Sequence, residues 1–118
     1  MKKRKNTKHS GLLRFFVYFD NSDKEFVGVC VELGIIKTGK DQSRVRKNLI
    51  NASIGYLETL HENDLPDYLL NQYPPKQYMD IFESIQAAST KREIKKSKVD
   101  MDDAQMFFKH VHSLCPAV

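Results

Sequence analysis

The strongest pattern in the chain lies between residues 42 and 62, where apolar or small residues recur at intervals of three and four positions. They are Val45, Leu49, Ala52, Ser53, Tyr56, Leu57 and Leu60. This spacing places them on one stripe of an α-helix, and such a stripe needs a sheet to cover. Asp41 stands where an N-cap side chain would accept the amides of the first turn, and Gly39 permits a sharp exit from a preceding strand. We therefore predict one amphipathic helix over residues 42–62.

Strand-forming residues precede this helix. The runs 12–20 and 25–33 are rich in aromatic and β-branched residues, and polar turn formers separate them, so they predict an antiparallel hairpin. Residues 35–38 form a short third run that closes at Gly39. The predicted fold class is α+β: a three-stranded antiparallel meander packed by one long helix, with a helical carboxyl-terminal extension.

Alternation along the two long strands predicts two different sheet faces. One face is fully apolar and should receive the helix; it comprises Leu13, Phe15, Val17 and Phe19 with Val27, Val29, Val31 and Leu33. The opposite face carries Arg14, Phe16, Tyr18 and Asp20 with Phe26, Gly28, Cys30 and Glu32. It is too aromatic to be left in water, and exposed apolar patches mark interfaces. We therefore predict partner-binding residues on this face, namely Phe16, Tyr18, Phe26 and Glu32.

The carboxyl-terminal half begins with a proline-containing connection, in which one helical turn is expected at residues 67–71. A second helix is predicted from Pro75, with apolar residues at Tyr78, Ile81, Phe82, Ile85 and Ala88, and it is one candidate lid for the second sheet face. A last short helix is predicted from Met101, with Ala104, Phe107, Phe108 and Val111 as its apolar residues. These patterns divide the chain into a basic arm (1–10), a ββ(β)α unit (11–64) and a helical extension after a linker (65–118).

The positive charge of the chain is concentrated at its amino end. The 118 residues have room for one domain with one core. The formal net charge is +4, yet five of the first nine residues are basic, so the remainder is close to charge balance. We expect a mobile arm in which no residue anchors a core, serving either as a solubilising tail or as a nucleic-acid contact. The candidate nucleic-acid-binding residues are Lys2, Lys3, Arg4 and Lys5 in the arm and Lys95 and Lys96 in the run KREIKKSK.

Few residues in the sequence indicate a cellular compartment or a cofactor. No segment is apolar enough for a secretory signal or a membrane span, so we expect a cytoplasmic chain with no membrane association. Cys30 and Cys115 lie far apart without the spacing of a metal site, which favours two free thiols. We expect no cofactor and no metal.

Catalytic arrangements are weakly indicated. Asp20, Glu32 and Glu58 invite comparison with the carboxylates that hold two metals in ribonuclease H-like nucleases, but their positions favour ordinary surface charges. The four histidines share no helix face at a useful spacing, and the five glycines form no phosphate-binding loop. The sequence therefore predicts a binding or regulatory protein with no catalytic residues.

A longer likeness covers residues 26–58, FVGVCVELGIIKTGKDQSRVRKNLINASIGYLE, and the preceding strand FFVYFD. This stretch resembles the HicB family, the antitoxin half of bacterial HicA/HicB toxin–antitoxin pairs. Glu32-Leu33 takes the place of the family's "pel" phrase, and Gly39 that of its closing glycine. The pattern of the family's helix falls on Asn48, Ala52, Tyr56 and Leu57.

The resemblance implies a partial ribonuclease H-like fold and a protein that binds a HicA-like RNA-cleaving toxin, blocks its access to RNA, and represses its own operon by binding operator DNA. It also implies a homodimer or higher oligomer. Two departures stand out: Arg44, Arg46 and Lys47 stand where the family has acids after the glycine, and the part from Pro66 onward matches neither a ribbon-helix-helix nor a helix-turn-helix. The expected function is a HicB-like antitoxin; a solitary nucleic-acid-binding regulator that uses the arm, or a metal nuclease, are the alternatives.

Overall fold

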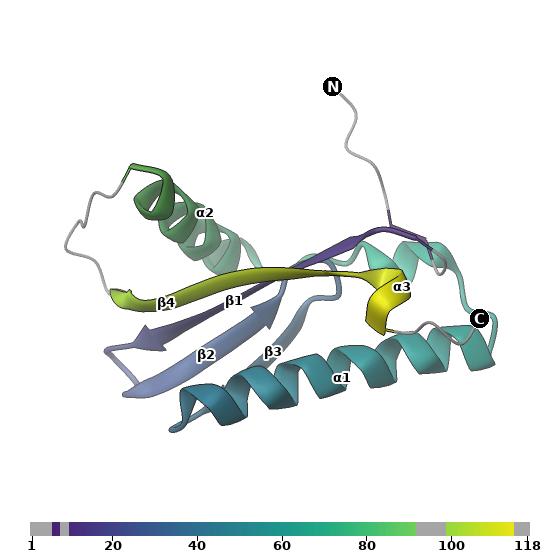
Figure 1. Cartoon of the computed structure of the whole chain (residues 1–118), viewed down its shortest axis with the longest axis horizontal. Coiled ribbons are helices and arrows are strands. Elements are labelled where there is room, and N and C mark those ends of the chain that lie inside the picture. The colour runs from purple at the N-terminus through teal and green to yellow at the C-terminus, as the bar shows by residue number, and fades with distance from the viewer. Residues whose placement is uncertain (1–5, 8–9, 92–98, 115–118) are drawn as a thin grey trace.

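The computed structural model describes residues 6–7, 10–91 and 99–114, with residues 88–91 and 99–103 described by their backbone alone. The strands are β1 (Leu12–Asp20), β2 (Glu25–Cys30), β3 (Ile35–Gly39) and β4 (Val99–His110). They form one antiparallel sheet in the order β3-β2-β1-β4 (Figure 1). The helices are α1 (Gln42–Glu62), the 3-10 turn η1 (Asp67–Leu70), α2 (Lys76–Lys91) and the short α3 (Val111–Leu114). No described helix is both long enough and apolar enough to cross a bilayer.

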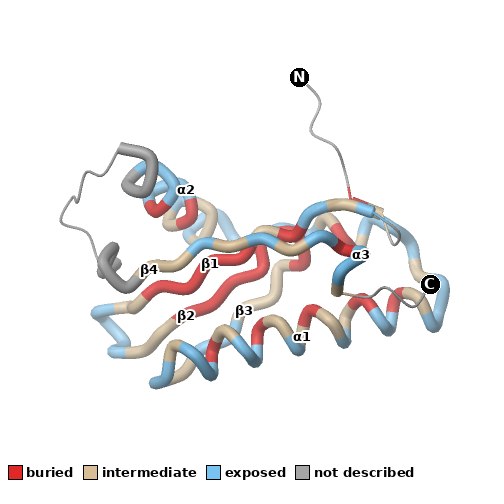
Figure 2. The backbone as a smooth tube through the Cα atoms, in the orientation of Figure 1, coloured by how far each residue is buried: buried red, intermediate tan, exposed pale blue. Residues whose placement is uncertain are grey.

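Helix α1 confirms the prediction made from its periodicity. The Asp41 side chain accepts hydrogen bonds from the backbone N–H of Ser43 (2.9 Å) and Arg44 (3.3 Å), which satisfies two amides of the first turn. The residues that α1 buries belong to the predicted stripe: Val45, Leu49, Ser53, Leu57 and Leu60. Figure 2 shows the buried positions of α1 on the side turned toward the strands.

The register of the β1–β2 hairpin differs by one residue from the register that the two predicted faces imply. A four-residue turn, 21–24, puts Asp20 opposite Glu25, and the register continues with Phe15 opposite Cys30. Because a one-residue offset exchanges the faces of a strand, Gly28 and Cys30 lie beneath α1 and the valines of β2 lie on the other side. The predicted grouping of Val27, Val29 and Val31 beneath α1 is therefore wrong.

Each face of the sheet has its own apolar cluster. Beneath α1, Leu13, Phe15 and Cys30 pack with Leu49 and Leu57. On the opposite face, which we call the α2 face, the residues of the sheet pack against Phe82 and Ile85 of α2. The second helix, named above as one candidate lid, is therefore the element that covers this face.

The carboxyl-terminal segment corrects the predicted last helix and adds a fourth strand. Residues 99–110 form β4, which pairs with β1, and only residues 111–114 are helical. Apolar residues at 104, 107, 108 and 111 fit helical spacing, yet short apolar runs do not distinguish a helix from a strand. The open edge of β1 decides the outcome, because its N–H and C=O groups require partners. Phe107 also stacks on Phe15, with ring centroids 4.9 Å apart.

Candidate functional site

The four residues predicted to bind a partner do not form one open surface. Phe16 and Tyr18 lie beneath α2 with 0% and 3% of their surface exposed, and the Phe16 ring is 5.3 Å from the Phe82 ring. The lid on this part of the face therefore comes from the same chain, and these two side chains are closed to a partner while α2 is docked. Phe26 lies on the opposite face, half-buried and 5.0 Å from the Phe19 ring.

Glu32, the fourth predicted residue, holds three parts of the fold together. Its side chain is 6% exposed and accepts two hydrogen bonds of 2.6 Å, one from the backbone N–H of Arg14 and one from Arg14 Nε. Its backbone carbonyl accepts the N–H of Gln72 (2.6 Å), in the loop that follows η1. Glu32 therefore positions the Arg14 guanidinium and ties the 71–73 loop to the sheet.

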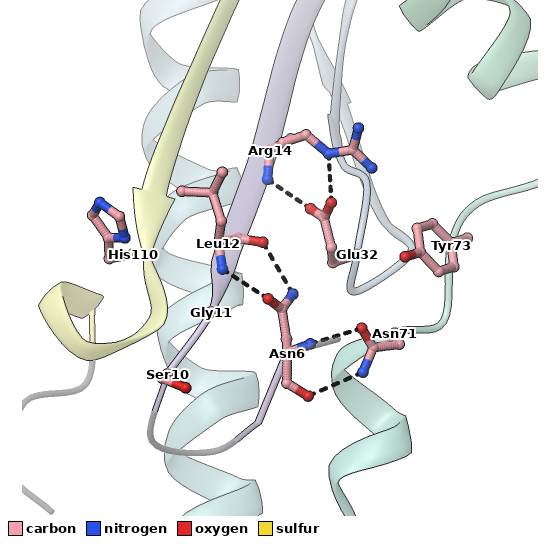
Figure 3. Close-up of a pocket in the computed structure, with 9 residues that line it drawn as sticks. All are labelled: Asn6, Ser10, Gly11, Leu12, Arg14, Glu32, Asn71, Tyr73 and His110. Atoms are coloured by element: carbon pink, nitrogen blue, oxygen red, sulfur yellow. Dashed lines mark hydrogen bonds and ion pairs between the residues drawn. The ribbon is translucent and has the colours of Figure 1, made fainter. Parts of the chain in front are cut away.

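Two contacts with described residues orient the Arg14 side chain, and neither is a hydrogen bond of its two terminal nitrogens. Its guanidinium carbon lies 5.2 Å from the centre of the Phe82 ring, and Nε is held by Glu32. Figure 3 shows the two terminal nitrogens directed away from Glu32. A guanidinium fixed in this way presents its remaining N–H groups in the fork geometry that suits a carboxylate.

These residues line a pocket of about 620 Å³ at the end of the sheet where β1 begins and β4 ends; we call it the end pocket (Figure 3). Its lining includes Asn6, Leu12, Arg14, Glu32, Tyr73 and His110. It lies on the α2 face, beyond the part that α2 covers. The pocket thus combines a half-buried ion pair with aromatic and aliphatic walls.

The wall formed by the amino-terminal segment was not anticipated from the sequence. Asn6 is 5% exposed; its side chain accepts the N–H of Leu12 (2.7 Å) and donates to the carbonyl of Leu12 (3.0 Å). Asn71 in turn bonds both backbone groups of Asn6. The expectation that no residue in 1–10 is anchored is therefore wrong at Asn6. The sequence feature connected with this anchor is Gly11. Its φ is 136°, and a Cβ added there would lie 2.1 Å from Asn6 Oδ1, so this position requires glycine.

Two exposed apolar side chains line the end pocket, and two more lie on η1 and β4, the elements that precede Asn71 and contain His110 of its lining. Leu12 is 37% exposed and Tyr73 is 43% exposed, and both line it. Phe108, next to Arg14 in the β1–β4 register, is 63% exposed, and Tyr68 on η1 is 66% exposed. We call these four residues the apolar rim. Such a concentration at one end of a small protein is typical of a docking surface.

Charge is distributed unevenly along α1. Its first turns carry the exposed residues Arg44 and Lys47, whereas its last turns, at the end of the molecule that holds the pocket, carry the exposed residues Glu58 and Glu62 (Figure 1). The residues predicted to bind nucleic acid, Lys2, Lys3, Arg4, Lys5, Lys95 and Lys96, lie outside the described residues.

The carboxylates compared with a nuclease site are not gathered. Asp20 accepts the turn amides of Ser22 and Asp23, Glu32 is paired with Arg14, and Glu58 is exposed on α1. Among the residues that the structure describes, no three His, Cys, Asp or Glu side chains lie close enough to hold a metal ion.

Cys30 is a buried free thiol on the α1 face. Burial raises its pKa to about 12, so the sulfur is protonated at neutral pH. A neutral, inaccessible thiol is a packing group rather than a nucleophile.

No protein family, curated protein or solved structure matches this chain. A rigid guanidinium, a buried carboxylate and an apolar rim make a surface suited to recognising another macromolecule.

Proposed function

We propose that this chain is an interaction protein of the HicB-like antitoxin kind, which binds a small RNA-cleaving toxin and blocks its access to RNA. The likeness over residues 26–58 supports the proposal, because those residues form β2, β3 and most of α1, one continuous unit of the α+β fold. The proposal assigns the docking role to the end pocket and its apolar rim.

The observation that carries the proposal is the exposure of the rim. Tyr68, Phe108 and Tyr73 place three aromatic side chains in solvent at one end of the molecule. Aromatic residues are enriched among the few interface residues that supply most of the binding energy. Their position next to a preformed pocket fits an anchor-in-pocket contact.

Charge supports a basic partner at this end. Glu58 and Glu62 are exposed on the last turns of α1, and the basic residues of α1 lie at its other end. Toxins that act on RNA carry positive charge to bind phosphates. The acidic end of α1 would steer such a protein toward the rim.

Co-expression with a HicA-like toxin, taken from the coding neighbourhood of this gene, tests the proposal. We expect a complex that survives purification and restores growth. Tyr68→Ala and Tyr73→Ala should each weaken binding about tenfold, the effect of losing one well-packed anchor. Arg44→Ala, at the opposite end of α1, is the matched control and should bind as the wild type does. Absence of both complex and growth rescue, or unchanged binding by both tyrosine variants, would refute the proposal.

A further inference from the structure

The two margins of the sheet are very different. The strand order makes β3 one margin and β4 the other. β3 is five residues long and carries the exposed Lys37, and both features discourage another strand from pairing there. β4 is twelve residues long, and its segment 104–108 (AQMFF) contains no charge and no proline. Among the described strands, the margin of β4 therefore lacks the usual protection over residues 104–108, while Asp103 precedes this segment and Lys109 follows it.

The hydrogen-bond pattern identifies the β4 residues whose backbone groups point outward. Val31 N donates to Arg14 O (2.8 Å), so the backbone groups of Arg14 face β2. Directions alternate along a strand, and Val111 N accordingly donates to the carbonyl of Gly11 (3.1 Å). Phe108 lies opposite Arg14, and Met106 lies opposite Phe16. The N–H and C=O groups of Met106 and Phe108 therefore point away from β1.

The same two residues carry the most exposed apolar side chains of β4. Phe108 is 63% exposed and Met106 is 37% exposed. Both lie on the α2 face, because their partners in β1 are on that face. Outward backbone groups and exposed apolar side chains thus coincide at one stretch of the margin.

We propose that β4 pairs with β4 of a second copy of this chain, antiparallel and centred on Phe107, so that two sheets join into one. This register places Met106 of each copy opposite Phe108 of the other, and Gln105 opposite Lys109. The segment is thus self-complementary about a two-fold axis, with apolar facing apolar and an amide facing an ammonium group. A register centred on Met106 would instead set Phe108 opposite Ala104 and bury less apolar surface.

The pairing uses backbone groups of β4 that already point outward. The outward N–H and C=O groups of Met106 and Phe108 are those that an antiparallel neighbour uses, and Phe107 keeps its bonds to β1 and its stacking on Phe15. Four apolar side chains, two from each copy, come together on the α2 face. The end pocket lies above β1, but Phe108 belongs both to the apolar rim and to this interface. Tyr68 and Tyr73 of the rim are not on β4, so their variants test toxin binding separately from the dimer, and Met106→Pro tests the dimer without changing a rim residue.

A pair of proline variants tests the proposal. Met106→Pro removes an outward donor from β4 and leaves the bonds of β4 to β1 in place. Thr38→Pro is the matched control: Thr38 pairs with Val27, whose backbone groups face β1, so the Thr38 N–H points outward at the other margin. Phe108→Lys provides a second disruption, at a side chain that is already 63% exposed.

Molar mass is measured by light scattering on a size-exclusion column, with circular dichroism to establish folding. The wild type and Thr38→Pro should both show twice the 13.7 kDa of one chain. Met106→Pro and Phe108→Lys should be folded and show the mass of one chain. A wild-type protein that keeps the mass of one chain up to millimolar concentration would overturn the proposal. A dimer that persists in both β4 variants would also overturn it.

Discussion

The close approach of α1 to β2 predicts that substitution by alanine has opposite effects on stability at Gly28 and at Gly55. Gly28 lies beneath α1, and a Cβ added there would lie 2.9 Å from Val45 Cγ1 and 3.2 Å from Leu49 Cδ2. Val45 cannot turn aside easily, because a β-branched side chain in a helix has one strongly preferred rotamer. Gly55 lies within α1, and a Cβ there would have no neighbour within 4 Å.

The size of the two effects follows from these distances. Overpacking of a core costs about 1–3 kcal/mol, and the reduced freedom of the unfolded chain returns about 0.4–1 kcal/mol. Gly28→Ala should therefore lower the free energy of unfolding by about 1–2 kcal/mol. Gly55→Ala should raise it by about 0.5–1 kcal/mol, the usual gain for this change in a helix interior. The two variants should differ in melting temperature by about 10 °C, since 1 kcal/mol corresponds to about 4 °C or more at this size.

Thermal and urea unfolding, followed by far-ultraviolet circular dichroism, measure the difference. The cost of Gly28→Ala should shrink in a Val45→Ala background, where the contacted methyl group is gone; a double-mutant cycle isolates this coupling. Equal stability of Gly28→Ala and Gly55→Ala would refute the reasoning. It would mean that Gly28 lies on the face opposite α1, where the sequence pattern placed it.

Two further predictions concern the amino-terminal segment and the buried thiol. Asn6→Ala should lower the free energy of unfolding by about 1–3 kcal/mol in urea titrations, because the part-buried N–H of Leu12 and the carbonyl of Leu70, whose bond to Asn6 is buried, both lose a partner; stability equal to the wild type would contradict the anchoring role. Cys30 should make the fold alkali-sensitive: the unfolded chain releases the thiol proton near pH 9 and the folded chain keeps it to a pKa of about 12, so stability falls as pH rises between these values. Urea midpoints from pH 8 to 11 should fall less steeply in Cys30→Ala, and parallel curves for the two proteins would rule out this explanation.

Local features of the fold could be predicted from the sequence. The bounds of α1 and its Asp41 cap follow from neighbouring residues, and the turn at η1 and the helix after Pro75 follow likewise. What failed depends on residues distant in the chain. The pairing of β1 with β2 turns on whether the loop has four residues or five, and one residue exchanges the faces. Strand β4 forms because β1 offers an open edge, which the sequence of β4 does not display.

The candidate site shows the same division. Glu32 was singled out for its place on the second face of the predicted sheet, but its actual role depends on Arg14, eighteen positions earlier. Asn6 and Asn71 are hydrogen-bonded although they lie 65 positions apart in the chain, and no sequence pattern around either residue indicates the other. A sequence of this kind reveals helices and strands, while the pocket arises where their ends meet.

The pairing of the first strand with the last has a consequence for synthesis. β1 emerges from the ribosome early, and β2, β3 and α1 can assemble on it as soon as they follow. Its other side waits for β4, which is made only after α1 and α2. Until then the nascent protein presents an unpaired aromatic strand, the kind of edge that recruits other chains. Protection of this edge from aggregation therefore begins only when β4 has been made, and products truncated before residue 99 should be the species that chaperones retain.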